Sequence, residues 1–143
     1  MSSRQEIVVE RWWKELWNQG NLAVIDEIIA PEFTDHDPSS PWVPGGVESV
    51  KALVNAYRSV FPDINFSVEQ QVACGETVVT HWRVRGTHKG ELMGLAPTGK
   101  VVEAEGISIL EVASGKIRRQ TTIWDTFGML QRLGVRTMPP PSV

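Results

Sequence analysis

The strongest constraint on the fold is a change of hydrophobic period at the tripeptide Phe-Pro-Asp, residues 61–63. Before this point, apolar residues recur at helical spacing, as in Val50, Leu53, Val54 and Tyr57. After it, apolar and polar residues alternate, which is typical of strands with one buried face. A chain that places its helices first and its strands second is expected to form an α+β domain.

The same patterns set approximate bounds for each element. We expect three helices and four strands, with helices at 5–18, 22–30 and 47–60 and strands at 66–72, 77–85, 101–112 and 117–124. The stretch 34–46 holds three prolines and two glycines and is predicted to be a loop, and 126–134 a short final helix. A curved, mostly antiparallel sheet wrapped around the three N-terminal helices would leave one concave pocket.

Bulk properties exclude several classes of protein. A chain of 143 residues predicts one domain, 1–143, with a core at about 5–135 and a proline-rich tail at 138–143. The net charge of −3 and the scattered basic residues argue against nucleic-acid binding, and the sequence has no apolar run of the roughly 20 residues that a membrane span needs. The single cysteine, Cys74, and the lack of an apolar leader favour a cytoplasmic protein.

Several segments together resemble one known family. These are WNQGNLAVIDEIIAPEFTDHDP, FPDINFSVEQ, HWRVRGTHKGELMGLAPTGK, GKI and WDTFGMLQRLG. They are similar to the SnoaL-like polyketide cyclases and ester cyclases of the nuclear transport factor 2-like superfamily, over about residues 5–135. The resemblance implies a cone-shaped domain with an apolar cavity and, because many relatives are dimers or higher oligomers, a homodimer. The sequence shows no nucleotide loop or metal-ligand set, so we expect no cofactor and no metal.

Asp125 is the first candidate for catalysis. The resemblance places the acid/base aspartate of the aldol cyclases near the end of the last strand, at Asp125 in IWDTFG. Its aromatic neighbours could desolvate the carboxylate, which would raise its pKa and make it a better base. The alternative is a helix N-cap for the segment that follows. This chain also departs from many relatives at Arg119 and Thr121, where they carry an acidic residue and an aromatic one.

His36, between Asp35 and Asp37, is the second candidate. A histidine at the mouth of the cavity could relay a proton or polarise a carbonyl group. The alternatives are a loop histidine bonded to a neighbouring aspartate, or a metal ligand, although three consecutive side chains diverge and no distant ligands accompany them.

Aromatic and flexible apolar side chains are the candidates for contact with a small hydrophobic molecule. Some of them could equally be core residues, and Trp42 could be a lid over a flat ligand or a loop anchor. The candidates are Trp13, Trp42, Trp82, Met93 and Phe127.

Four functions remain open, the last of them a scaffold role through the exposed face of the sheet. The first is a cofactor-independent acid/base enzyme for a hydrophobic carbonyl compound, either a cyclase or an isomerase or lyase. The second is a noncatalytic binding protein of the same fold. The third is an epoxide hydrolase that would use Arg83 or Arg119 with Asp125 and Glu105. We also expect a homodimer through the open face of the sheet, with arginines such as Arg83 opposite glutamates of the second copy.

Overall fold

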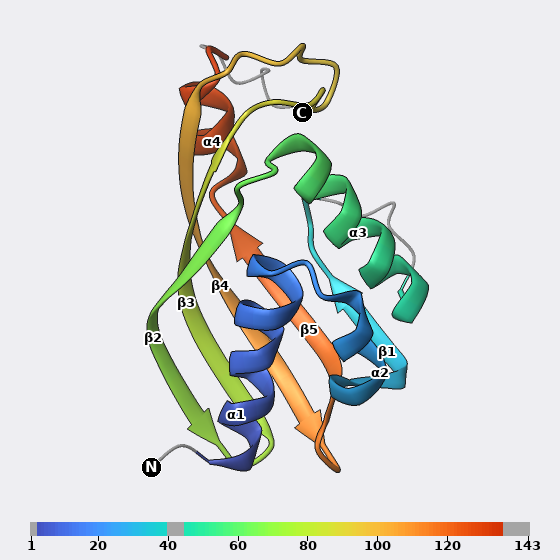
Figure 1. Cartoon of the computed structure of the whole chain (residues 1–143). Coiled ribbons are helices and arrows are strands. Elements are labelled where there is room, and N and C mark those ends of the chain that lie inside the picture. Colours follow the sequence, from blue (N-terminus) through green and yellow to red (C-terminus); the bar gives the residue numbers. More distant parts are fainter. Residues whose placement is uncertain (1–2, 40–44, 136–143) are drawn as a thin grey trace, which may run out of the picture.

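The computed structural model describes residues 3–39 and 45–135 and has the predicted α+β architecture. In Figure 1 the N-terminal helices and α3 cover one face of a curved sheet, and α4 lies at one end of it. The helical elements are α1 (Arg4–Arg11), the π-helix η1 (Trp12–Asn18), the 3-10 turn η2 (Leu22–Val24), α2 (Ile25–Ile28), α3 (Val47–Val60) and α4 (Thr126–Arg132).

The sheet has five strands in the order β1-β5-β4-β3-β2. Neighbouring strands from β2 to β5 pair antiparallel, whereas β1 pairs parallel with β5. The strands are β1 (Ile29–His36), β2 (Asn65–Cys74), β3 (Thr77–Thr87), β4 (Val101–Ala113) and β5 (Lys116–Trp124).

The first strand corrects the sequence-based prediction. Residues 29–36 were expected to be the end of a helix and the start of a loop, yet they form an edge strand in which Asp35 lies opposite Gln120. Pro31 falls within the irregular part of the pairing, between Ile29 and Thr34, where its missing N–H costs no ladder bond. Asp35 and Gln120 are 85 positions apart in the sequence, so a local pattern cannot predict their pairing.

The π-helix η1 explains a wide apolar sector in the first helical segment. Its wider turn is visible where the Gln19 N–H donates to the Lys14 carbonyl, five residues earlier. Four large side chains of η1 are buried together: Trp12, Trp13, Leu16 and Trp17. Asn18 then fixes η1 against β2, because its side chain exchanges two hydrogen bonds with the backbone of Phe66.

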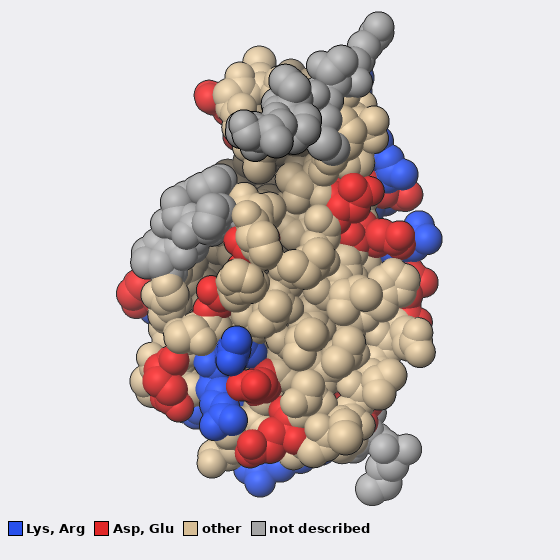
Figure 2. All heavy atoms as spheres, turned by 180° about the vertical axis from the view of Figure 1, so that it is seen from behind, with Lys and Arg blue, Asp and Glu red and all other residues tan. Residues whose placement is uncertain are grey.

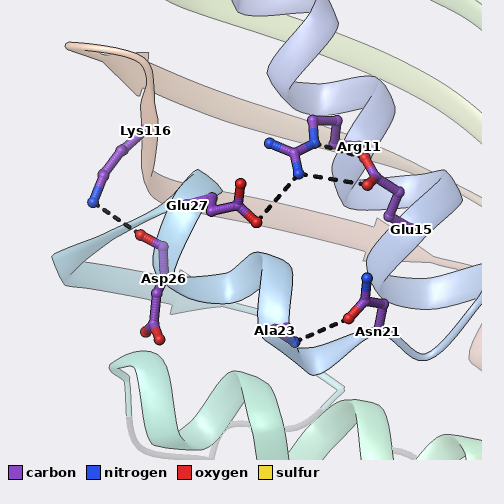
Figure 3. A network of polar contacts seen from close by, with 7 residues as sticks. All are labelled: Arg11, Glu15, Asn21, Ala23, Asp26, Glu27 and Lys116. Carbon is purple, nitrogen blue, oxygen red and sulfur yellow. Dashed lines mark hydrogen bonds and ion pairs between the residues drawn. The ribbon is translucent and has the colours of Figure 1, made fainter.

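Polar contacts hold the N-terminal elements together, as Figure 3 shows. Arg11 donates to Glu15 at 2.6 Å and lies 3.5 Å from Glu27 of α2. Lys116, at the start of β5, donates to the Asp26 carbonyl at 3.0 Å. These contacts fix the helices over the inner face of the sheet.

Alternation gives the sheet an inner and an outer face. On β3, Val78, Thr80 and Trp82 are buried beneath the helices, whereas Arg83 is exposed on the other side. Figure 2, which views the molecule from behind, shows a broad uncharged area with many of the charged side chains toward its margins. Large apolar residues exposed on this outer face are Val72, Val101, Ile107, Ile109 and Ile123.

Candidate active site

A cavity of about 90 Å³ lies between η1, α3, α4 and the inner face of the sheet. Most of the side chains that line it are aromatic or aliphatic. The apolar lining comprises Trp13, Trp17, Leu53, Tyr57, Phe61, Ile64, Phe66, Trp82, Val84, Val102, Ala104, Trp124 and Met129. The polar side chains at its wall are Asp35, Asp37, Ser108, Gln120 and Thr122, and Arg85, whose side chain is exposed, also borders it.

A cluster of rings forms one wall of the cavity. The Phe66 ring lies 5.1 Å from Trp13, 5.2 Å from Trp17 and 5.1 Å from Trp82, measured between ring centroids. The two hydrogen bonds between the Asn18 side chain and the Phe66 backbone hold this cluster in place. Flat apolar walls of this kind suit a planar ligand.

Asp35 is the half-buried carboxylate of this wall. Its Oδ1 accepts a hydrogen bond from Gln120 Nε2 at 3.2 Å, and the two residues are partners across the β1–β5 ladder. Burial raises the pKa of the Asp35 carboxyl, and the charge of Asp37 raises it further, against the lowering effect of the Gln120 bond. The His36 backbone N–H also lowers the pKa of the carboxyl, and among the described side chains only Gln120 donates a hydrogen bond to it.

Asp37 lies on the same face of the chain as Asp35 but has a different role. Its Oδ1 accepts from both the backbone N–H and the hydroxyl of Ser39, at 2.8 Å and 2.6 Å. Its Oδ2 lies 3.2 Å from Trp124 Nε1 and shares the single hydrogen of that nitrogen with Ser39 Oγ, which lies at 3.0 Å. With both oxygens engaged, Asp37 positions the Trp124 ring and the end of β1.

Two hydroxyls complete the polar lining. Ser108 Oγ lies 2.9 Å from Thr122 Oγ1 and accepts a hydrogen bond from Trp82 Nε1 at 3.0 Å. Ser108 and Thr122 are cross-strand partners on β4 and β5, and both are buried.

Asp125 does not point into the cavity, so that expectation is wrong. It is exposed and caps α4, where its Oδ1 accepts from the Gly128 N–H at 2.9 Å. The reason is alternation: Trp124 points inward and lines the cavity, so the next residue turns outward. Arg119 and Thr121, which share the face of Asp125, also lie outside the cavity lining.

His36 is likewise exposed, because it lies between two residues that face inward. Trp13 and Trp82 line the cavity, and their contact with a substrate remains a prediction. Met93 is 51% exposed in a turn, and neither it nor Phe127 belongs to the cavity lining, contrary to expectation. Trp42 lies outside the described residues.

The residues proposed for an epoxide hydrolase site do not come together in the structure. Arg83, Arg119, Glu105 and Asp125 are all exposed, so the set suggested for an epoxide hydrolase does not meet at the cavity. Within residues 3–39 and 45–135, no group of three or more histidines, cysteines or acidic residues is arranged to hold a metal ion. No helix in the same ranges is long and apolar enough to cross a membrane.

Sequence reasoning missed Asp35, Gln120, Ser108 and Thr122. The last three carry a signal that alternation could have supplied, since they are polar residues on the strand face that also carries Leu110 and Trp124. A polar side chain on an apolar face is the informative exception. Asp35 had no such signal, because β1 was not recognised as a strand.

Comparisons with known proteins support the fold and identify the family. A family model described as SnoaL-like polyketide cyclase matches residues 7–133. The nogalonic acid methyl ester cyclase of Streptomyces nogalater is 26% identical over 119 residues, which cover 82% of this chain and 89% of that enzyme. A candidate polyketide cyclase from Acidithiobacillus ferrooxidans superposes with a TM-score of 0.84 at 31% identity, covering 93% of this chain and 96% of that one.

IdmH, a candidate polyketide cyclase from Streptomyces antibioticus, superposes with a TM-score of 0.83 at 31% identity, over 93% of this chain and 100% of that one. The family model spans nearly the whole chain, including every strand that builds the cavity. The chain therefore belongs to the SnoaL-like polyketide cyclase family.

Proposed function

We propose that this protein is a cofactor-independent acid/base enzyme that closes a ring in a hydrophobic carbonyl compound, with Asp35 as the base. The observation that carries the proposal is the position of Asp35: it lies in the cavity wall, burial raises the pKa of its carboxyl, and among the described side chains only Gln120 donates to it. A raised pKa makes the carboxylate a stronger base while it remains ionised.

The reaction would be an intramolecular aldol addition. Asp35 takes a proton from the carbon next to a carbonyl group, and the electron pair of the broken C–H bond forms an enolate. The enolate carbon then bonds to a second carbonyl carbon of the same molecule, whose oxygen becomes an alkoxide. Asp35 returns its proton to that alkoxide, so the product is an isomer of the substrate.

Gln120 and Asp37 would act through Asp35 and Trp124. The Gln120 amide would fix the Asp35 carboxyl through its bond to Oδ1, so that the ligand meets the other side of the carboxylate. Asp37 holds the Trp124 ring, which would form part of the wall against a flat substrate.

The relatives suggest which compounds to test first. The curated relatives are a nogalonic acid methyl ester cyclase and an aklanonic acid methyl ester cyclase of Streptomyces galilaeus. The cavity of about 90 Å³ is smaller than the roughly 300 Å³ at which pockets for drug-sized ligands begin. A substrate with several rings would therefore require movement of lining side chains such as Met129.

The experiment is turnover of these two esters without added metal or cofactor. We expect at least one to give a product of unchanged mass, separated by chromatography, with the wild-type enzyme and not with Asp35→Asn. Equal product formation by both proteins would rule out Asp35 as the base, and tight binding of both esters without conversion would favour a binding protein.

We further propose that two copies associate through the outer face of the sheet. Ile107 and Ile123 are 48% and 59% exposed and lie opposite each other on β4 and β5. An exposed apolar cluster of this kind favours association with a second copy. Arg83 lies 3.6 Å from Glu105 within the same chain, so the arginine–glutamate contact across the dimer would compete with this pair.

A further inference from the structure

Four polar residues form a row across the inner face of the sheet. Gln71, Thr80, Ser108 and Thr122 stand opposite one another on β2, β3, β4 and β5. Thr80, Ser108 and Thr122 are buried, and the last two line the cavity. A buried hydroxyl normally has its hydrogen committed to an acceptor, so the hydrogens of this row can be counted.

At Gln71 and Thr80, the hydroxyl hydrogen already has an acceptor. Thr80 Oγ1 donates its hydrogen to Gln71 Oε1 at 3.2 Å and accepts from Trp13 Nε1 at 3.4 Å. Thr80 therefore has no hydrogen to offer a ligand, and it does not line the cavity.

At Ser108 and Thr122, one of the two hydroxyl hydrogens has no acceptor among the described residues. Because the indole N–H is a donor only, Ser108 Oγ must accept from Trp82, which leaves the bond between Ser108 and Thr122 to use one hydroxyl hydrogen. If Ser108 donates, the Thr122 hydrogen is uncommitted, and if Thr122 donates, the Ser108 hydrogen is. Within the described part of the chain, neither hydroxyl has a further acceptor.

We propose that the Ser108–Thr122 pair is a substrate-binding subsite that donates this hydrogen to an acceptor oxygen of the ligand, a carbonyl group in the first place. A buried donor without a partner costs free energy, and a ligand oxygen at the cavity wall removes that cost. The subsite thus favours a carbonyl compound over a hydrocarbon of the same shape.

The position of the pair suits the reaction proposed above, on which this part of the inference rests. Thr122 lies two residues beyond Gln120 on the same face of β5, a distance of about 7 Å along the strand. One ligand could therefore place a C–H group at Asp35 and a carbonyl oxygen at the hydroxyl pair. A donor in this place stabilises negative charge that develops on the oxygen during ring closure.

The shared hydrogen predicts an unusual response to mutation. Thr122→Val leaves the Ser108 hydrogen free, and Ser108→Ala leaves the Thr122 hydrogen free, so each single variant keeps one donor. Ser108→Ala also frees the Trp82 indole N–H as another donor at the wall, so all variants are made in the Trp82→Phe background, where only the double variant S108A/T122V loses the hydrogen. A purely structural role for the pair would show no such dependence of ligand preference on the second substitution.

Binding of two small probes measures this preference. Acetophenone and α-methylstyrene have nearly the same shape and differ by a C=O in place of a C=CH₂ group. Their dissociation constants are measured by calorimetry, and the ratio is compared between proteins, so that the different hydration of the two ligands cancels. We expect the ratio to shift about tenfold against acetophenone in S108A/T122V and less than about threefold in either single variant.

Thr80→Val is the matched control, because it removes a buried hydroxyl of the same row whose hydrogen is already committed. We expect no shift of its ratio against acetophenone, because the Trp13 indole N–H that it frees is a donor. A ratio in the double variant equal to that of the Trp82→Phe parent would overturn the proposal, and so would a full tenfold shift in both single variants.

A measurement on proteins with both hydroxyls intact covers the case in which the double variant does not fold. The infrared carbonyl band of bound acetophenone, labelled with carbon-13, should lie below its frequency in cyclohexane. It should stay low in Gln120→Met, which removes the amide donor of the same wall. A band at the cyclohexane frequency in the wild type, or in Gln120→Met alone, would overturn the proposal. If Asp35 is not the base, Asp35→Asn keeps turnover while the probe ratio still responds to the hydroxyl variants, so the two failures are distinguishable.

Discussion

The inner and outer faces of the same sheet carry aspartates in opposite situations. Asp35 faces the cavity, where burial raises the pKa of its carboxyl and Gln120 is the one described side chain that donates to it. Asp125 faces outward from the last strand, where it caps α4 in solvent. The residue type is the same, and the face of the strand decides between acid/base chemistry and helix capping. A motif position therefore has to be placed on a face before a role is carried over to it.

The largest effect should separate these two aspartates. We expect Asp35→Asn to lower kcat by about 10²- to 10⁴-fold, because it removes the base and keeps the shape. Asp125→Asn should change kcat by less than about twofold, because asparagine caps a helix as well as aspartate does. Steady-state turnover of the ester that the wild type converts is the measurement. The reverse result would restore Asp125 as the acid/base group.

A second contrast lies within one strand, at two adjacent residues. Gly106 faces inward, where an added Cβ would approach Trp82 to 2.6 Å and Trp124 to 2.5 Å. Gly106→Val should therefore cost about 1–3 kcal/mol in the free energy of unfolding and disturb both rings. Ile107→Val on the outer face should cost less than about 0.5 kcal/mol in the protomer. Urea unfolding gives both values, and similar costs at the two positions would contradict the assignment of faces.

The outer face provides a third contrast, in association rather than stability. Ile107→Lys or Ile123→Lys should weaken the proposed dimer at least tenfold, about 1.4 kcal/mol, and leave ester turnover per protomer in place. Ile7→Lys is the matched control, because Ile7 is also about half exposed, at 50%, but lies on α1. Light scattering over a range of protein concentrations measures the dimer dissociation constant of each variant. A wild-type monomer at micromolar concentration would remove the dimer, and a dimer that survives both substitutions would remove only this surface.

The same contrast shows how far the sequence could take the prediction. Period-two alternation predicted the four antiparallel strands because β3, β4 and β5 each have a buried and an exposed face, and β2 has a half-buried and an exposed one. It could not predict β1, whose partner is β5 and whose segment around Pro31 and Asp35 has the composition of a loop. The base proposed here lies on that strand, so the site could not be assembled from local pattern.

The resemblance to the family succeeded for the fold and placed Asp125 on the wrong face. Family motifs fix the order of elements, whereas the direction of a side chain at the end of a strand depends on where alternation stops. Trp124 is the last inward residue of β5, and the helix cap begins at the next position. The second and the fourth residue before Trp124 on β5 also face inward. Applying this alternation would have identified Thr122 and Gln120, both of which line the cavity.

The smallest expected effect concerns stability and pH at Asp35. Burial, followed by the nearby charge of Asp37, raises the pKa of the folded Asp35 carboxyl above the ordinary value of about 3.8. Below that value the carboxyl is protonated in both the folded and the unfolded chain, so it does not change stability. As the pH rises through it, the unfolded chain releases the proton first and stability falls. The loss is complete once the pH exceeds the raised folded pKa.

An asparagine at this position cannot ionise, so the variant escapes the loss. We therefore expect Asp35→Asn to have a higher Tm than the wild type near pH 7, with a difference that narrows as the pH falls toward about 4. Asp125→Asn, exposed and still able to cap α4, should show no such narrowing. Thermal unfolding followed by circular dichroism at several pH values gives the two curves. A Tm difference for Asp35→Asn that widens toward low pH would mean that the carboxylate stabilises the folded chain. Asp35 would then lie in a polar environment. Its proposed role as base requires a desolvated one.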